Sequence, residues 1–182
     1  MEPRHAPEWL TTTWFNTPEA LNLERLRGRV VVLHAFQMLC PGCVAHGIPQ
    51  VQRVAEAFKS APLTVVGLHT VFEHHEAMGL ESLRAFLHEY RVWFPVGVDA
   101  PGPGGDPMPR TMRTYGMQGT PTTLLIDAEG RLRQQVFGRH DDLLLGAEIS
   151  TLLGEAGHSA TGQAVTVVPE TNGCAEGRCG VE

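Results

Sequence analysis

The hydrophobic positions of the chain follow two periods, and each period predicts one kind of secondary structure. Short, nearly continuous apolar runs rich in β-branched residues are typical of strands that are covered on both faces. These runs predict strands at residues 29–36, 63–69, 94–99, 122–127 and 132–137. The turn Ala128-Glu129-Gly130 between the last two predicts an antiparallel hairpin.

Between the strands, apolar residues recur three and four positions apart, as they do along one face of a helix. They predict helices at about residues 43–59, 80–90 and 109–115, and a final helix after Asp141, whose side chain is a good N-cap. Helices that alternate with strands in this way predict an α/β fold with a central sheet.

Both ends of the chain depart from this pattern. Residues 1–20 mix aromatic residues with Pro and Thr and predict a short strand or hairpin held to the core by its aromatic side chains. From Gly154 onward the helical pattern fades into Gly, Ala, Ser and Thr. The 182 residues, 42% of them hydrophobic, suffice for one well-buried domain. We predict a domain at residues 1–155 and a flexible tail at 156–182.

Charge and hydropathy exclude several classes of protein. The formal net charge is -6 with acidic and basic residues interspersed, which argues against nucleic acid or an anionic membrane as the main partner. The first residues lack the apolar core of a signal peptide, and no stretch reaches the roughly 18 apolar residues of a membrane span. The expected location is the cytoplasm if Met1 is native, and the periplasm or exterior if a leader has been removed.

A Cys-Pro-Gly-Cys motif follows the first buried strand directly. Its proline suits the first turn of a helix, so Cys40 is expected at a helix N-terminus, where unpaired N–H groups and the helix dipole favour a thiolate. Cys40 is therefore the predicted nucleophile of a redox dithiol, and Cys43, one turn further, the resolving thiol. A zinc site or a pair of core thiols is the alternative, but the remaining cysteines, Cys174 and Cys179, lack zinc-finger spacing.

A second motif, Gly119-Thr120-Pro121, lies immediately before the strand at residues 122–127. A proline inside a central strand would remove a ladder hydrogen bond, whereas at this position it is compatible with a cis peptide bond. The hydroxyl of Thr120 can reach the dithiol or a substrate, or can simply reflect the strand propensity of threonine.

These motifs resemble the thioredoxin superfamily. Within it, the segment from Trp14 to Phe36, which contains NTPEALNLERLRGRVVVL, is most similar to the bacterial TlpA-like thiol-disulfide oxidoreductases. The resemblance covers roughly residues 9–153. It implies a three-layer thioredoxin-like sandwich with a central mixed β-sheet. It also implies that Cys40 attacks substrate disulfides, that Cys43 resolves the mixed disulfide, and that cis-Pro121 lies against the dithiol and helps to hold the partner chain.

The spacing of one proline departs from that family. Pro49 lies six residues after Cys43, whereas five is usual in the family. We expect the extra residue, near Gly47, to make a local bulge in the helix.

Two histidines near the dithiol have open roles. His34 lies six residues before Cys40 in the predicted strand, and alternation alone does not decide which face it takes. It is either a proton shuttle for Cys43, because imidazole titrates near neutrality, or a hydrogen-bonded core histidine. His46, three residues after Cys43, either tunes the dithiol or is an ordinary surface residue.

A cluster of His69, Glu73, His74 and His75 follows the strand at residues 63–69. The carboxyl ends of parallel strands lie at one end of a sheet, so the cluster is expected near the dithiol. Neutral imidazole suits zinc, copper or nickel, but neighbouring histidines on a loop are more often solvated. We predict neither a metal nor a cofactor.

Cys174 and Cys179 lie in a glycine-rich part of the predicted tail. Their spacing permits a disulfide. They are a second redox pair that exchanges with Cys40, a metal clip, or idle thiols; exposed cysteines in a flexible segment exchange readily.

The sequence thus favours a thiol-disulfide oxidoreductase whose partners are protein or small-molecule disulfides and a thiol electron donor. A thiol peroxidase of the peroxiredoxin type is one alternative, but such enzymes need Thr or Ser three residues before the reactive cysteine and Pro seven before, where this chain has Gln37 and Leu33. A copper chaperone of the same fold is the other; its relatives use C-x-x-x-C.

Overall fold

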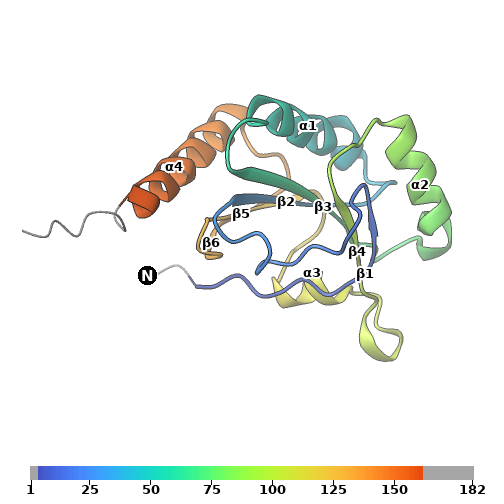
Figure 1. Ribbon diagram of the computed structural model, residues 1–182. Helices are drawn as coiled ribbons and strands as arrows, with labels where there is room; N and C mark the ends of the chain where they lie inside the picture. The colour runs from blue at the N-terminus through green and yellow to red at the C-terminus, as the bar shows by residue number, and fades with distance from the viewer. Residues whose placement is uncertain (1–3, 162–182) are drawn as a thin grey trace, which may run out of the picture.

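A mixed sheet of six strands in the order β1-β4-β3-β2-β5-β6 forms the centre of the molecule (Figure 1). The computed structural model describes residues 4–161. The strands are β1 (Thr11–Phe15), β2 (Val30–Phe36), β3 (Leu63–His69), β4 (Val96–Asp99), β5 (Thr122–Ile126) and β6 (Leu132–Phe137). The five strands predicted from apolar runs are all present, and the N-terminal segment adds β1 as a single strand on the edge of the sheet.

The central strands β2, β3 and β4 are parallel, whereas β5 runs antiparallel to β2, β6 to β5, and β1 to β4. The carboxyl ends of β2, β3 and β4 therefore lie at one end of the sheet. We call it the dithiol end, because Cys40 follows β2 there, and we call the opposite end the far end. This arrangement confirms the predicted thioredoxin-like α/β sandwich with a mixed sheet.

Helices cover the two faces of the sheet unequally (Figure 1). The helices α1 (Ile48–Ala57), α2 (Leu80–Glu89) and α4 (Asp142–Thr161) pack on one face, and α3 (Arg110–Thr114) and the N-terminal segment pack on the other. Short 3-10 turns lie at His75–Met78 and Pro103–Gly105. Each face has its own apolar cluster, as expected for a sheet buried on both sides.

Strand β2 is buried over its whole length. Val30, Val32 and Phe36 belong to the cluster under α1, while Val31, Leu33 and Ala35 belong to the cluster under α3. Because side chains alternate along a strand, His34 points to the same face as Val32 and Phe36. The structure thereby places His34 beneath the helix that carries Cys43.

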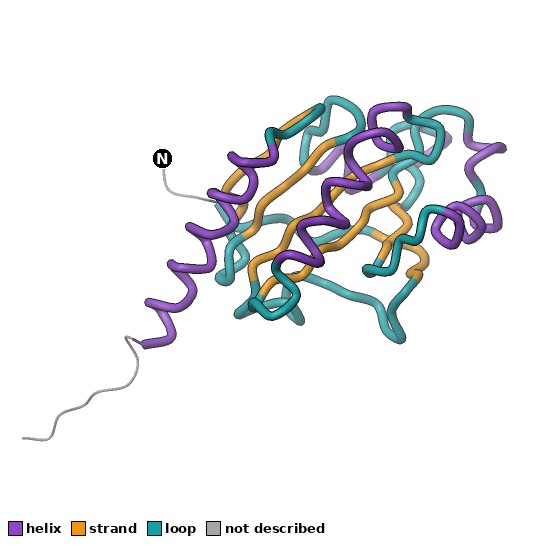
Figure 2. The backbone as a smooth tube through the Cα atoms, turned by 90° about the horizontal axis from the view of Figure 1, so that it is seen from above, coloured by secondary structure: helices purple, strands orange, loops and turns teal. Residues whose placement is uncertain are grey.

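Helix α4 begins at the dithiol end and runs to the far end. Its N-terminus is capped by Asp141, which accepts hydrogen bonds from the N–H groups of Leu143 (2.9 Å) and Leu144 (3.1 Å), as predicted. Near its other end Glu155 pairs with Arg133, at the start of β6. Figure 2 shows α4 continuing past the end of the sheet.

The final helix is longer than the sequence pattern indicated. It continues to Thr161, six residues past the predicted domain boundary at 155. At the other terminus, the carbonyl of Arg4 accepts a hydrogen bond from Leu132 N–H, so the first described residues also lie at the far end.

Candidate active site

The two cysteines of the CPGC motif lie next to each other as thiols at the dithiol end. Cys40 is half-buried, and the backbone N–H of Cys43 donates a hydrogen bond to its Sγ over 3.2 Å. The Cys40 thiol also lies 3.4 Å from the carbonyl oxygen of Thr120, to which it donates. Cys40 thus accepts a hydrogen bond from an N–H group at the start of a helix, an arrangement that stabilises negative charge on sulfur. It also contacts the loop before Pro121.

Cys43 is fully buried, in contrast to Cys40. Burial, and next the hydrogen bond with Cys40, raises the pKa of the Cys43 thiol to about 12. A thiol in this state remains protonated at neutral pH, so it becomes a nucleophile only when a neighbouring group takes its proton.

Pro121 follows a cis peptide bond and packs against the turn that carries the cysteines. A Cβ atom on Gly42 would lie 3.3 Å from Pro121 Cδ, and one on Gly47 would lie 3.3 Å from Pro121 Cβ. The two glycines therefore let the turn approach the proline ring closely. The predicted cis bond and the predicted position of Pro121 beside the dithiol are both confirmed.

His34, on β2, is buried next to Thr123 of β5 and beneath this turn. Its Nδ1 lies 3.0 Å from Oγ1 of Thr123, at hydrogen-bond distance, whereas its Nε2 has no hydrogen-bond partner among the described residues. Burial lowers the pKa of His34 to about 4. The imidazole is therefore neutral near pH 7, and one of its nitrogens remains free.

The free nitrogen of His34 faces an irregular turn of helix. Residues Cys43–Gly47 form a π-helical turn between the CPGC motif and α1. A Cβ atom on Gly47 would lie 2.6 Å from Nε2 of His34. The bulge expected near Gly47 is thus confirmed, and the structure gives its role: the wide turn and the missing side chain make room for the imidazole ring.

Gln37 is a site residue that the sequence did not reveal. Its buried side-chain NH2 lies 3.5 Å from Thr120 Oγ1, and its side-chain oxygen accepts a hydrogen bond from Phe72 N–H over 3.3 Å. Gln37 thus connects the segment before Cys40 with the loop before Pro121 and with the segment after β3. Its partners are 83 and 35 residues away, so no local pattern could have indicated them.

The predicted histidine cluster is not assembled. His69 is buried against the Phe36 ring, with centroids 5.4 Å apart, and burial lowers its pKa to about 4. Glu73, His74 and His75 are exposed. No group of three or more His, Cys, Asp or Glu side chains in the described part of the chain is arranged to hold a metal ion.

The remaining candidates are peripheral or outside the structure. His46 is exposed on the π-helical turn. Cys174 and Cys179 lie outside the described residues, so their proposed exchange with Cys40 remains a prediction. None of the helices within residues 4–161 is both long enough and apolar enough to cross a membrane.

Comparison with known proteins agrees with this geometry. The model of the AhpC/TSA family matches residues 4–135. DipZ of Mycobacterium tuberculosis is 29% identical over 153 residues, which cover 80% of this chain and 20% of DipZ. The protein SUPPRESSOR OF QUENCHING 1, chloroplastic, of Arabidopsis thaliana is 28% identical over 125 residues, or 69% of this chain and 11% of that protein. This chain therefore spans a fifth or less of the length of these curated relatives.

Solved structures are similar over more of their length. The thioredoxin-like superfamily protein SPOA0173 is 60% identical with a TM-score of 0.80, and the match covers 83% of this chain and 97% of that chain. A thiol-disulfide isomerase from Corynebacterium glutamicum is 46% identical with a TM-score of 0.77, covering 81% of this chain and 96% of that one. The family match, these likenesses and the fold agree: the chain belongs to the AhpC/TSA family within the thioredoxin superfamily.

Proposed function

We propose that this protein is a thiol-disulfide oxidoreductase that uses Cys40 as nucleophile and Cys43 as resolving thiol. The observation that carries the proposal is the unequal pair of thiols: Cys40 is accessible and accepts a helix N–H group at 3.2 Å, while Cys43 is fully buried one turn away. Such a pair separates the thiol that meets the substrate from the thiol that completes the reaction. The printed name of the Corynebacterium glutamicum protein, a thiol-disulfide isomerase, supports the same chemistry.

The proposed reaction has two exchange steps. The Cys40 thiolate attacks one sulfur of the substrate disulfide, forms a mixed disulfide and releases the other substrate sulfur as a thiolate. Cys43 then loses its proton and attacks Sγ of Cys40, which forms the Cys40–Cys43 disulfide and releases the second substrate thiolate. Two electrons pass from the dithiol to the substrate, and the reverse sequence oxidises a substrate dithiol.

We propose His34 as the group that takes the proton of Cys43. Its Nε2 has no other hydrogen-bond partner among the described residues and faces the π-helical turn that begins at Cys43. The imidazole is neutral at pH 7, so Nε2 offers a free lone pair to the thiol proton; burial makes the ring a weak base, and His34 would hold the proton only while Cys43 attacks. Pro121, beside Gly42, and Thr120, beside Cys40, would line the place where a substrate chain approaches the dithiol.

The geometry gives less support to a thiol peroxidase. The side chain three residues before Cys40 is that of Gln37, and its hydrogen bonds go to Thr120 and Phe72 N–H. A peroxidase needs a hydroxyl aimed at the reacting peroxide from this position. A copper chaperone gains no support from the histidines, because among residues 4–161 no group of three or more His, Cys, Asp or Glu is arranged to hold a metal ion.

Reduction of insulin by dithiothreitol, followed by turbidity, tests the proposed function. We expect the wild-type protein to accelerate precipitation of the insulin B chain, Cys40→Ser to abolish the acceleration, and Cys43→Ser to accumulate mixed disulfides seen on non-reducing gels. Consumption of hydrogen peroxide with the same thiol donor should stay at the rate of the Cys40→Ser variant. Rapid peroxide consumption without insulin reduction would assign the peroxidase function instead.

The physiological direction of electron flow depends on the donor and the compartment. We propose protein or small-molecule disulfides as substrates and a thiol as donor, and equilibration with glutathione measures which way electrons pass. A reduction potential of about -270 mV is typical of a reductase, whereas a potential of about -120 mV is typical of a strong oxidant.

A further inference from the structure

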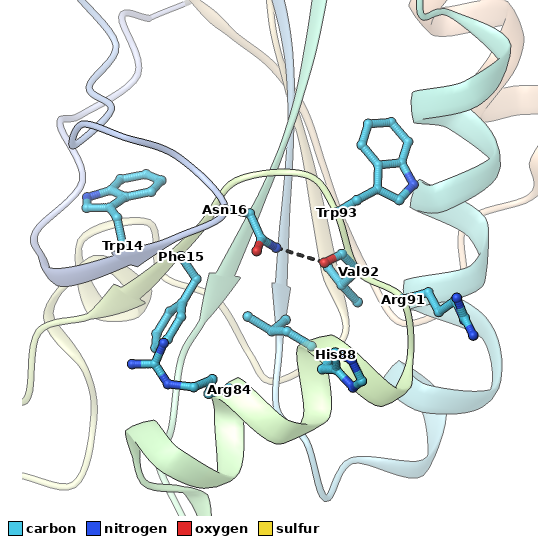
Figure 3. A pocket seen from close by; sticks show the side chains of 9 residues that line it. Trp14, Phe15, Asn16, Arg84, His88, Arg91, Val92 and Trp93 are labelled. Atoms are coloured by element: carbon cyan, nitrogen blue, oxygen red, sulfur yellow. Dashed lines mark hydrogen bonds between the residues drawn. The ribbon is translucent and has the colours of Figure 1, made fainter.

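Hollows open at both ends of the sheet, and their polar side chains are arranged differently. The hollow at the far end, of about 880 Å³, has Arg84 and Arg91 in its wall, and Figure 3 shows their guanidinium groups pointing to different sides. They do not converge on one ligand. The hollow at the dithiol end is smaller, about 200 Å³, and the imidazole of His69 is part of its wall. We call it the β3–β4 hollow, because it lies at the carboxyl ends of these two strands.

The walls of the β3–β4 hollow are mostly apolar and come from one face of the sheet. Val71, Met78 and Val98 line it, and all three belong to or pack against the apolar cluster that α1 and α2 cover. The ring of His69 lies on the same face, against the ring of Phe36 in that cluster, with 5.4 Å between the centroids. The start of α2 and three prolines of the segment after β4 complete the lining. These side chains therefore surround one space.

The β3–β4 hollow has one buried polar atom that is not bonded. The carboxylate of Asp99 accepts hydrogen bonds from N–H groups at the start of α3, and that of Asp106 pairs with Arg113. His75, which also lines the hollow, is exposed. His69 is 1% exposed, and its Nε2 is buried without a hydrogen-bond partner among residues 4–161. Because an unbonded polar atom in a protein interior costs stability, this nitrogen indicates where the polar group of a ligand binds.

The chemistry of these walls suits a phenol. Burial lowers the pKa of His69 to about 4, and a neutral imidazole has one donor and one acceptor nitrogen, either of which can bond to a hydroxyl group. A charged ligand group would lose its hydration among the apolar walls, whereas an aromatic ring gains by packing on them. The volume is below the range of drug-sized ligands, about 300–1,000 Å³, so the hollow fits a group of the size of one side chain.

The β3–β4 hollow is close enough to Cys40 for one substrate chain to contact both. Neighbouring strands are about 4.8 Å apart, so the ends of β3 and β4 lie roughly 5–10 Å from the end of β2. Val71, in the wall, precedes Phe72, whose N–H donates a hydrogen bond to Gln37, three residues before Cys40. An extended polypeptide advances about 3.3–3.6 Å per residue. A side chain two or three residues from the substrate cysteine therefore reaches the hollow.

We propose that the β3–β4 hollow receives a tyrosine side chain of a polypeptide substrate. The hydroxyl group of the tyrosine bonds to Nε2 of His69, and its ring packs on the apolar walls. This inference rests on the proposed function, because it places the tyrosine two or three residues from the cysteine whose disulfide Cys40 attacks. The hollow thereby selects protein disulfides that have a tyrosine nearby.

Peptide mixed disulfides with 5-thio-2-nitrobenzoate test the selection. When Cys40 attacks the peptide sulfur, the bond to nitrobenzoate breaks, and the coloured thiolate leaves with the electron pair. The peptides carry Tyr, Phe or Ala at each position from three residues before to three after the cysteine. At the best position, kcat/KM should be about fivefold higher for Tyr than for Phe, because of the hydrogen bond, and about tenfold higher for Phe than for Ala.

Variants of the hollow should change this selection. His69→Phe removes the hydrogen bond, so the Tyr and Phe peptides should react at equal rates. Leu80→Asp changes a half-exposed wall residue at the start of α2, where a helix tolerates aspartate, and should reduce the preference for both aromatic peptides over Ala. Leu143→Asp, an exposed leucine in the first turn of α4, is the matched control and should keep the wild-type preferences. Urea unfolding checks the fold of each variant.

A binding experiment separates this proposal from the proposed function. In the Cys40→Ser/Cys43→Ser protein, 4-cresol should shift the NMR resonances of the His69 ring and bind about fivefold more tightly than toluene. Equal wild-type rates for the Tyr and Phe peptides, or equal affinity for 4-cresol and toluene, would overturn the proposal. Preferential binding of 4-cresol without selection among the peptides would assign the hollow to a free phenol and overturn the substrate contact. Failure of every peptide to react would refute the proposed function instead, and the substrate contact with it.

Discussion

Two buried histidines make the stability of this protein fall in mild acid. Burial lowers the pKa values of His34 and His69 from 6.5 to about 4. Between those two values the unfolded chain binds protons that the folded protein does not, so stability is greatest above pH 6.5 and falls as the pH drops towards 4. The loss at pH 5, relative to pH 7, is about 2 kcal/mol for each histidine.

Replacing either histidine should therefore flatten the pH dependence. We expect His69→Gln to change the free energy of unfolding less between pH 7 and pH 5 than the wild type does, by about 2 kcal/mol. Urea unfolding of the reduced proteins at both pH values measures it. His88→Gln, which replaces an exposed histidine, is the control. If the wild type and His69→Gln lose the same free energy, burial does not keep His69 neutral.

The role proposed for His34 separates the two steps of the reaction. Ellman's reagent releases one coloured thiolate when Cys40 attacks and a second when Cys43 resolves the mixed disulfide. We expect His34→Ala to leave the first release unchanged and to slow the second by about a hundredfold, the lower limit of general-base effects. Stopped-flow absorbance at pH 7 measures both phases.

Two variants control this experiment. His46→Ala, on the exposed side of the same turn, should change neither phase, and Cys43→Ser should lack the second. A His34→Ala protein with a normal second phase would remove His34 from the mechanism and leave it as a core residue.

At the scale of elements, the π-helical turn Cys43–Gly47 and the imidazole of His34 form one packing unit. A methyl group on Gly47 would lie 2.6 Å from Nε2 and 2.7 Å from Cε1 of a ring that is buried and cannot move away. We expect Gly47→Ala to lower the free energy of unfolding by about 2 kcal/mol, as overpacking does. Chemical denaturation at pH 7 measures the change.

A double-mutant cycle tests whether the clash is with His34. In a His34→Ala background, Gly47→Ala should cost less by about 1 kcal/mol or more, because the added methyl group then has space. Gly146→Ala is the matched control: nothing lies near its Cβ position in α4, so this change should stabilise by about 0.5–1 kcal/mol. Additive effects of Gly47→Ala and His34→Ala would show that the two residues do not contact.

The elements that the sequence predicted well are those with strong local signals. The apolar run of β2 indicated the central strand without any knowledge of its neighbours, and the extra residue before Pro49, relative to the spacing usual in the family, indicated the π-helical turn. The face taken by His34 did not follow from alternation, because it depends on which helix covers which side of β2. Gln37 was missed because its partners are distant in sequence, and the end of α4 was missed because small residues after Gly154 continue a helix without an apolar stripe.

At the scale of the whole molecule, the length of α4 constrains the predicted disulfide exchange between Cys40 and the pair Cys174 and Cys179, which we call the relay. The helix has 20 residues and is therefore about 30 Å long, and it leads away from Cys40. Cys174 lies thirteen residues after Thr161, and a fully extended chain of that length spans about 43–47 Å. Cys174 can thus return to the dithiol end, with little length to spare.

If the relay operates, gentle oxidation of the Cys43→Ser protein should give a Cys40–Cys174 or Cys40–Cys179 disulfide within one chain. Peptide mapping under non-reducing conditions, at low protein concentration, identifies it. Deleting residues 170–182 should leave the reaction with Ellman's reagent unchanged and slow turnover with the physiological donor. Absence of both internal disulfides, together with unchanged turnover after the deletion, would rule the relay out.

The described chain enters and leaves the fold at the same end. Arg4 bonds to the start of β6, and α4 carries the chain outward past Thr161, both at the far end of the sheet. A protein domain fused at either terminus, or a surface to which the protein is tethered there, would therefore lie on the side opposite Cys40. The fold can be inserted into a longer polypeptide as a self-contained module whose dithiol still faces outward to meet its partners.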